Sequence, residues 1–228
     1  MIKAIIFDAD GPLYHRTGDI TSQTQELLEE YGYHGDIKLF DERYEKEKFK
    51  AYVAEETPAQ MFQNILALVG VNISTAQAKE VANKFDAIHK QVTATPDAIA
   101  TLRQLKAEGY LTCVLTDSFY SAEAKWPWFE QLGLKQYLDD MVSSLDIRKL
   151  KNTPEAYQAC LDKLGVSADE AVFVGHQQYE MDGSKAVQVT SIAILPIATP
   201  HIRADYTINA LSELSGVLKR INSVRGQV

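Results

Sequence analysis

Residues 4–14, which read AIIFDADGPLY, join a short apolar run to two carboxylates and a glycine. Four consecutive apolar residues of strand-favouring type, too few for a helix, are typical of a strand buried on both faces. Asp8 follows this strand directly and Asp10 lies two residues later. Because side chains alternate along an extended chain, both carboxylates point to one side, and Gly11 lets the backbone turn away. Ligands bind beyond the carboxyl ends of strands in open α/β sheets, so Asp8 and Asp10 are candidate catalytic residues.

The composition is that of an ordinary soluble globular protein. Its 228 residues carry a net charge of -8, which argues against a surface built for nucleic acid or for an anionic membrane. The two cysteines, Cys113 and Cys160, lack the short spacing of a zinc site or a redox pair. No apolar run approaches the length of a bilayer span, and the first strand begins where a signal peptide would lie. We therefore expect a cytoplasmic protein with no membrane or nucleic-acid partner.

The region after Tyr14 has a helical pattern up to about residue 92. Ser22 with Gln25, and Ser74 with Gln77, have the spacing of capping boxes, and Pro58 is suited to the first turn of a helix. The apolar periodicity predicts helices over about residues 22–32, 40–55, 58–70 and 74–88.

From residue 93 onward, short apolar runs alternate with capped helices. Strands are expected at residues 111–115, 141–142, 171–174, 191–195 and 206–208, and helices at about 95–108, 126–133, 153–164 and 211–221. This alternation predicts a doubly wound, Rossmann-like parallel sheet covered by helices on both faces. We expect an α/β core made of residues 1–14 and 93–228, with a helical cap domain inserted at residues 15–92.

Polar side chains follow other predicted strands as well. Thr116 and Asp117 end the strand that begins at Leu111, and His176 follows the strand that ends at Gly175. Taken singly, such residues are most often turn formers or helix caps. Lys151 lies in a loop before a helix, and Glu180 and Asp182 lie a few residues beyond His176.

The order of these elements is strand-Asp-x-Asp-Gly, strand-Thr, loop-Lys before a helix, and strand-Gly-His followed by an acid. This order, with a helical insert after the first strand, resembles the haloacid dehalogenase-like superfamily, chiefly its phosphatases with a helical cap. The resemblance covers essentially the whole chain. Each motif is short, but their order and their places at strand ends make the combination specific.

The resemblance implies phosphoryl transfer through an aspartyl-phosphate. Asp8 matches the nucleophile and Asp10 matches the general acid and base. Thr116 and Lys151, helped by the backbone N–H of Asp117, match the groups that bind the phosphoryl oxygens. The implied substrate is a small phosphorylated metabolite, over which the cap would close to exclude water.

The resemblance also implies a magnesium ion bound by Asp8, by the carbonyl of Asp10 and by the acids of the last motif. Here the sequence departs from the pattern of the family. His176 stands where an aspartate usually faces the metal, the later acid falls at Glu180 with Asp182 as an alternative, and Pro12 replaces a threonine. An imidazole in place of a carboxylate weakens magnesium binding, unless Glu180 reaches the ion or the site takes manganese or another transition metal.

Three functions are consistent with these residues. A working phosphatase ranks first, because Asp8, Asp10, Thr116 and Lys151 are all present together. A catalytically weak or inactive relative that binds or regulates ranks second. A metal-free 2-haloacid dehalogenase ranks third, because that reaction needs no acid for an alcohol leaving group and the resembling dehalogenases lack the aspartate at position 10. The sequence leaves the substrate and the oligomeric state open.

Overall fold

The computed structural model describes residues 1–226 of the chain, which divide into two compact units. One unit contains Met1–His15 and the chain from Ala94 onward, and the other contains Arg16–Thr93. These limits lie one residue from the predicted ones. The segments that join the units, β2 (Tyr14–Arg16) and β3 (Val92–Ala94), form a two-stranded sheet.

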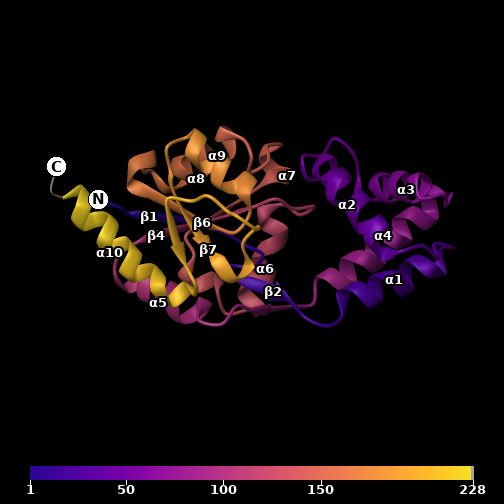
Figure 1. Cartoon of the computed structure of the whole chain (residues 1–228), viewed down its shortest axis with the longest axis horizontal. Helices are drawn as coiled ribbons and strands as arrows, with labels where there is room; N and C mark the ends of the chain where they lie inside the picture. The colour runs from indigo at the N-terminus through magenta and orange to yellow at the C-terminus, as the bar shows by residue number, and fades with distance from the viewer. Residues whose placement is uncertain (227–228) are drawn as a thin grey trace. The chain divides into compact units, whose positions relative to one another are not determined.

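The larger unit is built on a parallel sheet with the strand order β5-β4-β1-β6-β7-β8 (Figure 1). The bounds of its strands are β1 Ala4–Asp8, β4 Leu111–Thr116, β5 Asp140–Ser143, β6 Ala171–Gly175, β7 Thr190–Ile194 and β8 Tyr206–Ile208. The order places β1 between β4 and β6, and each of its residues is buried. The predicted doubly wound α/β fold is confirmed. Asp8 differs slightly from the prediction, because it is the last residue of β1 rather than the first residue after it.

Helices cover both faces of this sheet, with α8 and α9 on one face and α5 and α10 on the other (Figure 1). The bounds of the helices in this unit are α5 Ala98–Ala107, α6 Ala122–Gln131, α7 Ser144–Ile147, α8 Pro154–Leu164, α9 Gln178–Ala186 and α10 Leu214–Arg225. Short 3-10 turns occur at η1 Lys135–Tyr137, η2 Ala168–Glu170, η3 Leu195–Ile197 and η4 Leu211–Glu213.

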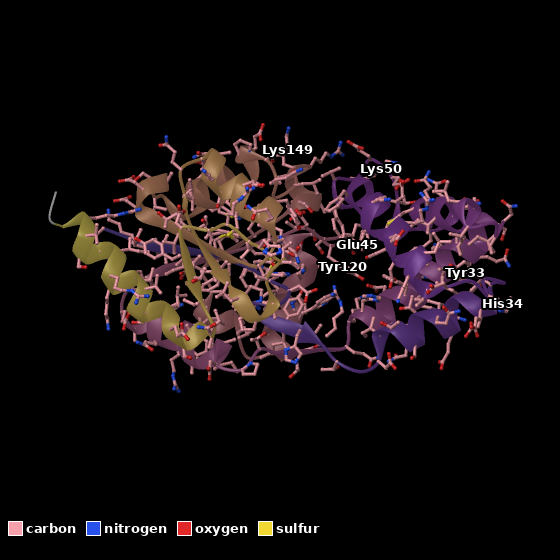
Figure 2. The ribbon with its side chains drawn as sticks, viewed as in Figure 1. Tyr33, His34, Glu45, Lys50, Tyr120 and Lys149 are labelled. Carbon is pink, nitrogen blue, oxygen red and sulfur yellow. The ribbon has the colours of Figure 1, made fainter. Side chains whose placement is uncertain are left out.

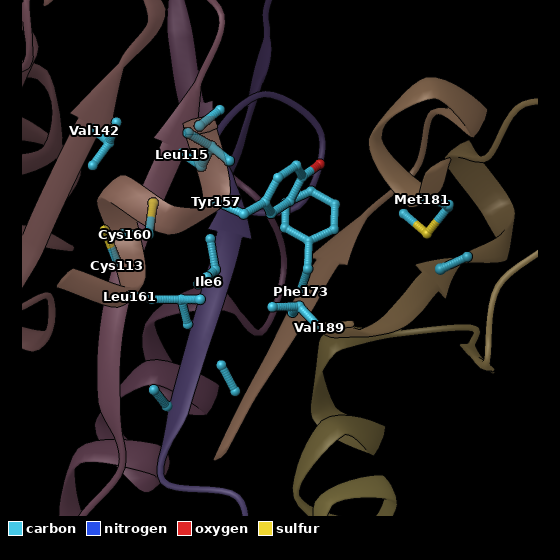
Figure 3. Packing of buried hydrophobic residues seen from close by; sticks show 14 residues of the cluster. Ile6, Cys113, Leu115, Val142, Tyr157, Cys160, Leu161, Phe173, Met181 and Val189 are labelled. Atoms are coloured by element: carbon cyan, nitrogen blue, oxygen red, sulfur yellow. The ribbon is translucent and has the colours of Figure 1, made fainter. Parts of the chain in front are cut away.

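The layer between the sheet and α8 and α9 is a closely packed apolar cluster (Figure 3). The ring of Tyr157 on α8 meets the ring of Phe173 on β6 edge to face, with the ring centroids 5.2 Å apart. Both cysteines, Cys113 and Cys160, are free thiols buried in the same cluster. This cluster holds α8 and α9 in place, and the two helices carry residues of the candidate site.

The smaller unit consists mainly of α1 (Ile20–Glu30), α2 (Ile37–Tyr52), α3 (Pro58–Leu68) and α4 (Thr75–His89). Ser74 and Gln77 form the predicted capping box at the start of α4. The predicted cap at Ser22 is wrong, because the carboxylate of Asp19 accepts hydrogen bonds from both the backbone N–H and the hydroxyl of Ser22. The stronger acceptor therefore starts α1 two residues earlier, at Ile20.

The surface of α2 is charged and solvated. Lys48 pairs with Glu45 and Lys50 pairs with Glu47, each at 2.6 Å. Glu45 and Lys50 are labelled in Figure 2. His34, in the connection between α1 and α2, is exposed. Lys48 and Lys50 thus have acidic partners on the same helix, as the interleaved sequence indicates.

None of the helices within residues 1–226 combines the length and the apolar character that a bilayer span requires.

Candidate active site

The register of the parallel sheet brings the polar strand ends to one edge. Asp8 at the end of β1 lies opposite Leu115 of β4, so Thr116 extends one residue further. On the other side, Phe7 lies opposite Val174 of β6, which leaves Gly175 beside Asp8 and His176 just beyond it. Strand order and register therefore place residues from three distant segments around the carboxylate of Asp8.

The side chains of Lys151 and His176 lie close to that carboxylate. The Nζ of Lys151 donates to Asp8 Oδ1 at 2.7 Å and to Glu180 Oε1 at 2.5 Å, so one ammonium group links two buried carboxylates. The imidazole Nδ1 of His176 lies 3.2 Å from the other oxygen, Asp8 Oδ2, but it makes no hydrogen bond with Asp8 or with any other described residue. Asp8 Oδ1 also accepts a hydrogen bond from the backbone N–H of Ala9 at 2.7 Å.

These contacts determine the direction in which the pKa values of Asp8, His176 and Glu180 shift. Burial alone would raise the pKa of Asp8, but Lys151 and His176 together hold that pKa well below its usual range. Burial would lower the pKa of His176, and the adjacent Asp8 carboxylate outweighs it and raises that pKa. For Glu180, both burial and the nearby Asp8 raise the pKa. Asp8 is therefore an ionised carboxylate, ready to act as a nucleophile without first losing a proton.

Glu180 is held rigidly by its surroundings. Its Oε2 accepts hydrogen bonds from the backbone N–H groups of His176 and Gln177, each at 3.0 Å. The hydroxyl of Tyr157 donates to the backbone carbonyl of Glu180 at 2.6 Å. A Cβ at Gly175 would lie 2.5 Å from Glu180 Oε2, so the carboxylate packs against the strand end only because that residue is glycine. Glu180 thus fixes the start of α9 through its backbone contacts, and its other carboxylate oxygen positions the ammonium group of Lys151.

The loop that carries Lys151 is fixed by a second acid. The Oδ1 of Asp117 accepts a hydrogen bond from the backbone N–H of Lys151 at 3.1 Å. Burial raises the pKa of Asp117 to about 6. The sequence indicates a role for the backbone N–H of Asp117 only, and the contact of its side chain with the Lys151 loop is visible only in the structure.

Thr116 has an unexpected neighbour, Lys125 of α6. The Nζ of Lys125 donates to Thr116 Oγ1 at 3.0 Å and to the hydroxyl of Tyr14 at 3.2 Å. Its side chain is only 3% exposed, although lysine is rarely buried. The sequence carries one signal for this position, since Lys125 lies four residues before the buried Phe129 and so shares its face of the helix.

The predicted site residues are not all equally close to Asp8. Lys151, His176 and Glu180 lie around it. Asp8, His176 and Glu180 each have one nitrogen or oxygen atom able to bind a metal, and these three atoms lie within 4.8 Å of one another. Asp10 is half-buried in the turn after β1. Asp182 is exposed on α9 and accepts a hydrogen bond from Gln178, so the geometry favours Glu180 over this alternative.

The donor set does not fit the magnesium ion that the resemblance implies. The position between the carboxylates of Asp8 and Glu180 is taken by the ammonium group of Lys151. The second oxygen of Glu180 already accepts two backbone N–H groups, and the second oxygen of Asp8 faces an imidazole whose pKa is raised. Magnesium binds oxygen ligands, and an imidazole nitrogen is a poor ligand for it. The residues present thus provide a site for the ammonium group of Lys151 rather than for magnesium.

Comparison with known proteins identifies the family. The model of the haloacid dehalogenase-like hydrolases matches residues 5–194. The chain belongs to this family. The match includes β1, β4, β6 and the Lys151 loop, and therefore every strand end that contributes to the site.

Related proteins of two kinds are similar to the chain. It is 24% identical to the glyceraldehyde 3-phosphate phosphatase of Methanocaldococcus jannaschii, over 97% of this chain and 99% of that protein. It is 27% identical to (S)-2-haloacid dehalogenase 4A of Burkholderia cepacia and 30% identical to (S)-2-haloacid dehalogenase 1 of a Pseudomonas species. The matches to the dehalogenases span 62% and 60% of those proteins, which is less than two thirds of their length.

Solved structures show the same fold. A protein described as a predicted phosphoglycolate phosphatase from Haemophilus somnus superposes with a TM-score of 0.74 at 16% identity, over 95% of this chain and 98% of that one. The 2-haloacid dehalogenase from Pseudomonas syringae superposes with a TM-score of 0.71 at 21% identity, over 96% of this chain and 99% of that one. At these identities the likeness establishes the fold only, because one fold can carry different chemistry.

Proposed function

We propose that the chain is a phosphatase that hydrolyses a small phosphorylated metabolite through an aspartyl-phosphate on Asp8. The observation that carries the proposal is the ionised, buried carboxylate of Asp8 between Lys151 at 2.7 Å and His176 at 3.2 Å. A carboxylate in this setting can attack an electrophile, and the adjacent ammonium group attracts an anionic substrate.

In the first step, an oxygen of Asp8 forms a bond to phosphorus while the bond from phosphorus to the ester oxygen breaks. The leaving alkoxide takes a proton from Asp10, which acts as the general acid. The ammonium group of Lys151 and the hydroxyl of Thr116 bind the phosphoryl oxygens, whose charge redistributes as the bonds change.

In the second step, Asp10 removes a proton from a water molecule, and that water attacks the phosphorus of the acyl phosphate. The bond between phosphorus and the Asp8 oxygen breaks, which releases phosphate and restores the carboxylate. The proposal includes no magnesium ion, because the donor set described above does not fit one.

A second candidate function, 2-haloacid dehalogenation, is favoured by that same misfit. In this reaction Asp8 displaces a halide from carbon, and water then hydrolyses the resulting ester. The presence of Asp10 favours the phosphatase. A halide ion leaves without being protonated, so dehalogenation needs no general acid in its first step. The match of the phosphatase relative over 97% of the chain, against 62% for the dehalogenase, gives further support.

The experiment compares p-nitrophenyl phosphate with 2-chloropropionate as substrates of the purified protein. We expect release of phosphate from the first and no release of chloride from the second. Asp8→Asn keeps the size of the side chain but removes the nucleophile, and we expect it to lower kcat by at least about a thousandfold. Release of chloride without release of phosphate would replace the proposal with the dehalogenase, and release of neither would favour a binding protein.

A further inference from the structure

We infer that the side chain of His176 replaces a divalent cation beside Asp8, so that this site hydrolyses its substrate without a metal ion. The statement about metal binding stands on the geometry alone, whereas the statement about hydrolysis rests on the proposed function. A hydrolase of this kind would keep its activity in the presence of a chelator.

The first support is the pairing of the carboxylates. Lys151 Nζ lies 2.7 Å from Asp8 Oδ1 and 2.5 Å from Glu180 Oε1, with all three side chains almost completely buried. A metal that joined Asp8 to Glu180 would have to displace this ammonium group from both contacts. Removing one partner from a buried ion pair is strongly unfavourable, because a charge is left without compensation.

The second support is the position of the imidazole. Its Nδ1 lies 3.2 Å from Asp8 Oδ2, the oxygen that Lys151 does not contact. At this distance the ring lies in van der Waals contact with the oxygen, although Nδ1 makes no hydrogen bond with a described residue. His176 therefore occupies the side of the carboxylate that Lys151 leaves open.

The third support is that the surrounding backbone holds this residue in place. The backbone N–H of His176 donates to Glu180 Oε2 at 3.0 Å, and its carbonyl accepts from the N–H of Thr199 at 2.8 Å. A Cβ built on Gly11 would lie 3.3 Å from both Cε1 and Nδ1, so the ring packs directly on the backbone of the turn after β1. A ring packed in this way has little space in which to move aside for a hydrated cation.

The inferred role is electrostatic and positional. With the ammonium group of Lys151 on one oxygen and the ring of His176 against the other, the charge of the Asp8 carboxylate is compensated by Lys151 while an anionic phosphoryl group approaches. The contacts also fix the plane of the carboxylate, which orients one oxygen for attack. His176 thus acts on the reacting carboxylate itself and is a catalytic residue in this scheme.

Calorimetric titration of magnesium and manganese chlorides into the protein tests the inference without depending on activity. We expect no saturable binding to the wild-type protein at millimolar concentrations. His176→Asp replaces the imidazole with an oxygen ligand, and we expect its magnesium affinity to rise at least tenfold. The matched control is His201→Asp, which makes the same change at an exposed position. Saturable magnesium binding to the wild type that Asp8→Asn removes would overturn the inference, as would a His176→Asp variant that folds and still binds no magnesium.

A second experiment measures hydrolysis of p-nitrophenyl phosphate after exhaustive dialysis against a chelator, and it tests whether hydrolysis needs a metal ion. We expect the wild type to retain its rate and to gain less than twofold when magnesium is returned. Activity that disappears with the chelator and returns with magnesium would overturn the inference and leave the phosphatase intact. If no condition gives hydrolysis, the proposed function fails, while the calorimetry still decides whether His176 excludes the metal.

Discussion

At the scale of single residues, the contact between Lys125 and Thr116 changes how the phosphoryl oxygens are bound. A threonine hydroxyl that accepts a hydrogen bond from an ammonium group keeps its own proton free to donate. Lys125 therefore orients Thr116 Oγ1 as a donor, at the end of a strand where an anionic substrate would lie. Its ammonium group also lies 5.7 Å from the centroid of the Tyr14 ring and 5.5 Å from that of Trp128, which helps to compensate its burial.

Lys125→Met tests this positioning role. Methionine keeps much of the apolar stem but cannot donate to Thr116, so we expect kcat/KM for p-nitrophenyl phosphate to fall about tenfold, mainly through a higher KM. Lys125→Arg restores a cationic donor, and we expect it to recover part of the loss. Lys135→Met, at an exposed lysine, is the control. A lower melting temperature with unchanged kinetics would show that Lys125 serves only the stability of the fold.

The neighbours of Asp8 could be predicted from the sequence only in part. Asp8 and His176 could be proposed as neighbours, because parallel strands end at one edge and both residues lie at strand ends. Lys151 and Glu180 could be added only through the resemblance to the family. The partners of Glu180 could not be proposed, since they depend on how α9 meets the end of β6. For Lys125 the spacing from Phe129 was the one signal in the sequence, and its contacts with Thr116 and Tyr14 depend on the packing of α6.

At the scale of elements, the approach of α9 to the Lys151 loop depends on Gly183. A Cβ at this position would lie 2.0 Å from the backbone carbonyl oxygen of Lys151 and 2.7 Å from the ring of Tyr157. The loop must therefore shift if any side chain is introduced. Because Lys151 bridges Asp8 and Glu180, such a shift reaches the carboxylate that we propose as the nucleophile.

Gly183→Ala tests this dependence. We expect it to lower the free energy of unfolding by about 1 to 3 kcal/mol, since it overpacks a buried contact, and to lower kcat at temperatures where the protein stays folded. Gly216→Ala is the matched control, because Gly216 is exposed on α10 with no atom near the added Cβ. There alanine should stabilise the helix by about 1 kcal/mol and leave kcat unchanged. Denaturant titrations and steady-state kinetics measure both effects, and equal behaviour of the two variants would contradict this view of the α9 contact.

Helix starts were the least predictable part of the elements. The sequence analysis placed the helix over residues 126–133, whereas α6 runs from Ala122 to Gln131 and contains Pro127. Ser121 starts it, because its hydroxyl accepts a hydrogen bond from the N–H of Ala124 at 3.1 Å. The N–H of Ala122 also donates to Asp146 at 2.7 Å, a long-range contact that no local pattern reveals.

At the scale of the whole molecule, the order of strands and helices along the chain was enough to predict the α/β core. The parallel sheet follows from alternating apolar runs and capped helices, and the family match over residues 5–194 agrees with it. Whether the site binds a metal ion could not be predicted from the sequence, because the type of residue at position 176 does not show how its ring and its neighbours are arranged. Only the contacts of Asp8 and Glu180 with Lys151 show that an ammonium group occupies this site.

The most direct test of the central claim is to trap the phosphoryl group on Asp8. In Asp10→Asn the leaving p-nitrophenolate needs no acid, whereas the water of the second step has lost its base, so an acyl phosphate should accumulate. Acid quenching and borohydride reduction would convert the phosphorylated aspartate into homoserine, which peptide mass spectrometry locates. We predict homoserine at position 8 with p-nitrophenyl phosphate and none without it. Phosphate release by Asp10→Asn with homoserine at another position, or at none, would contradict the proposed mechanism.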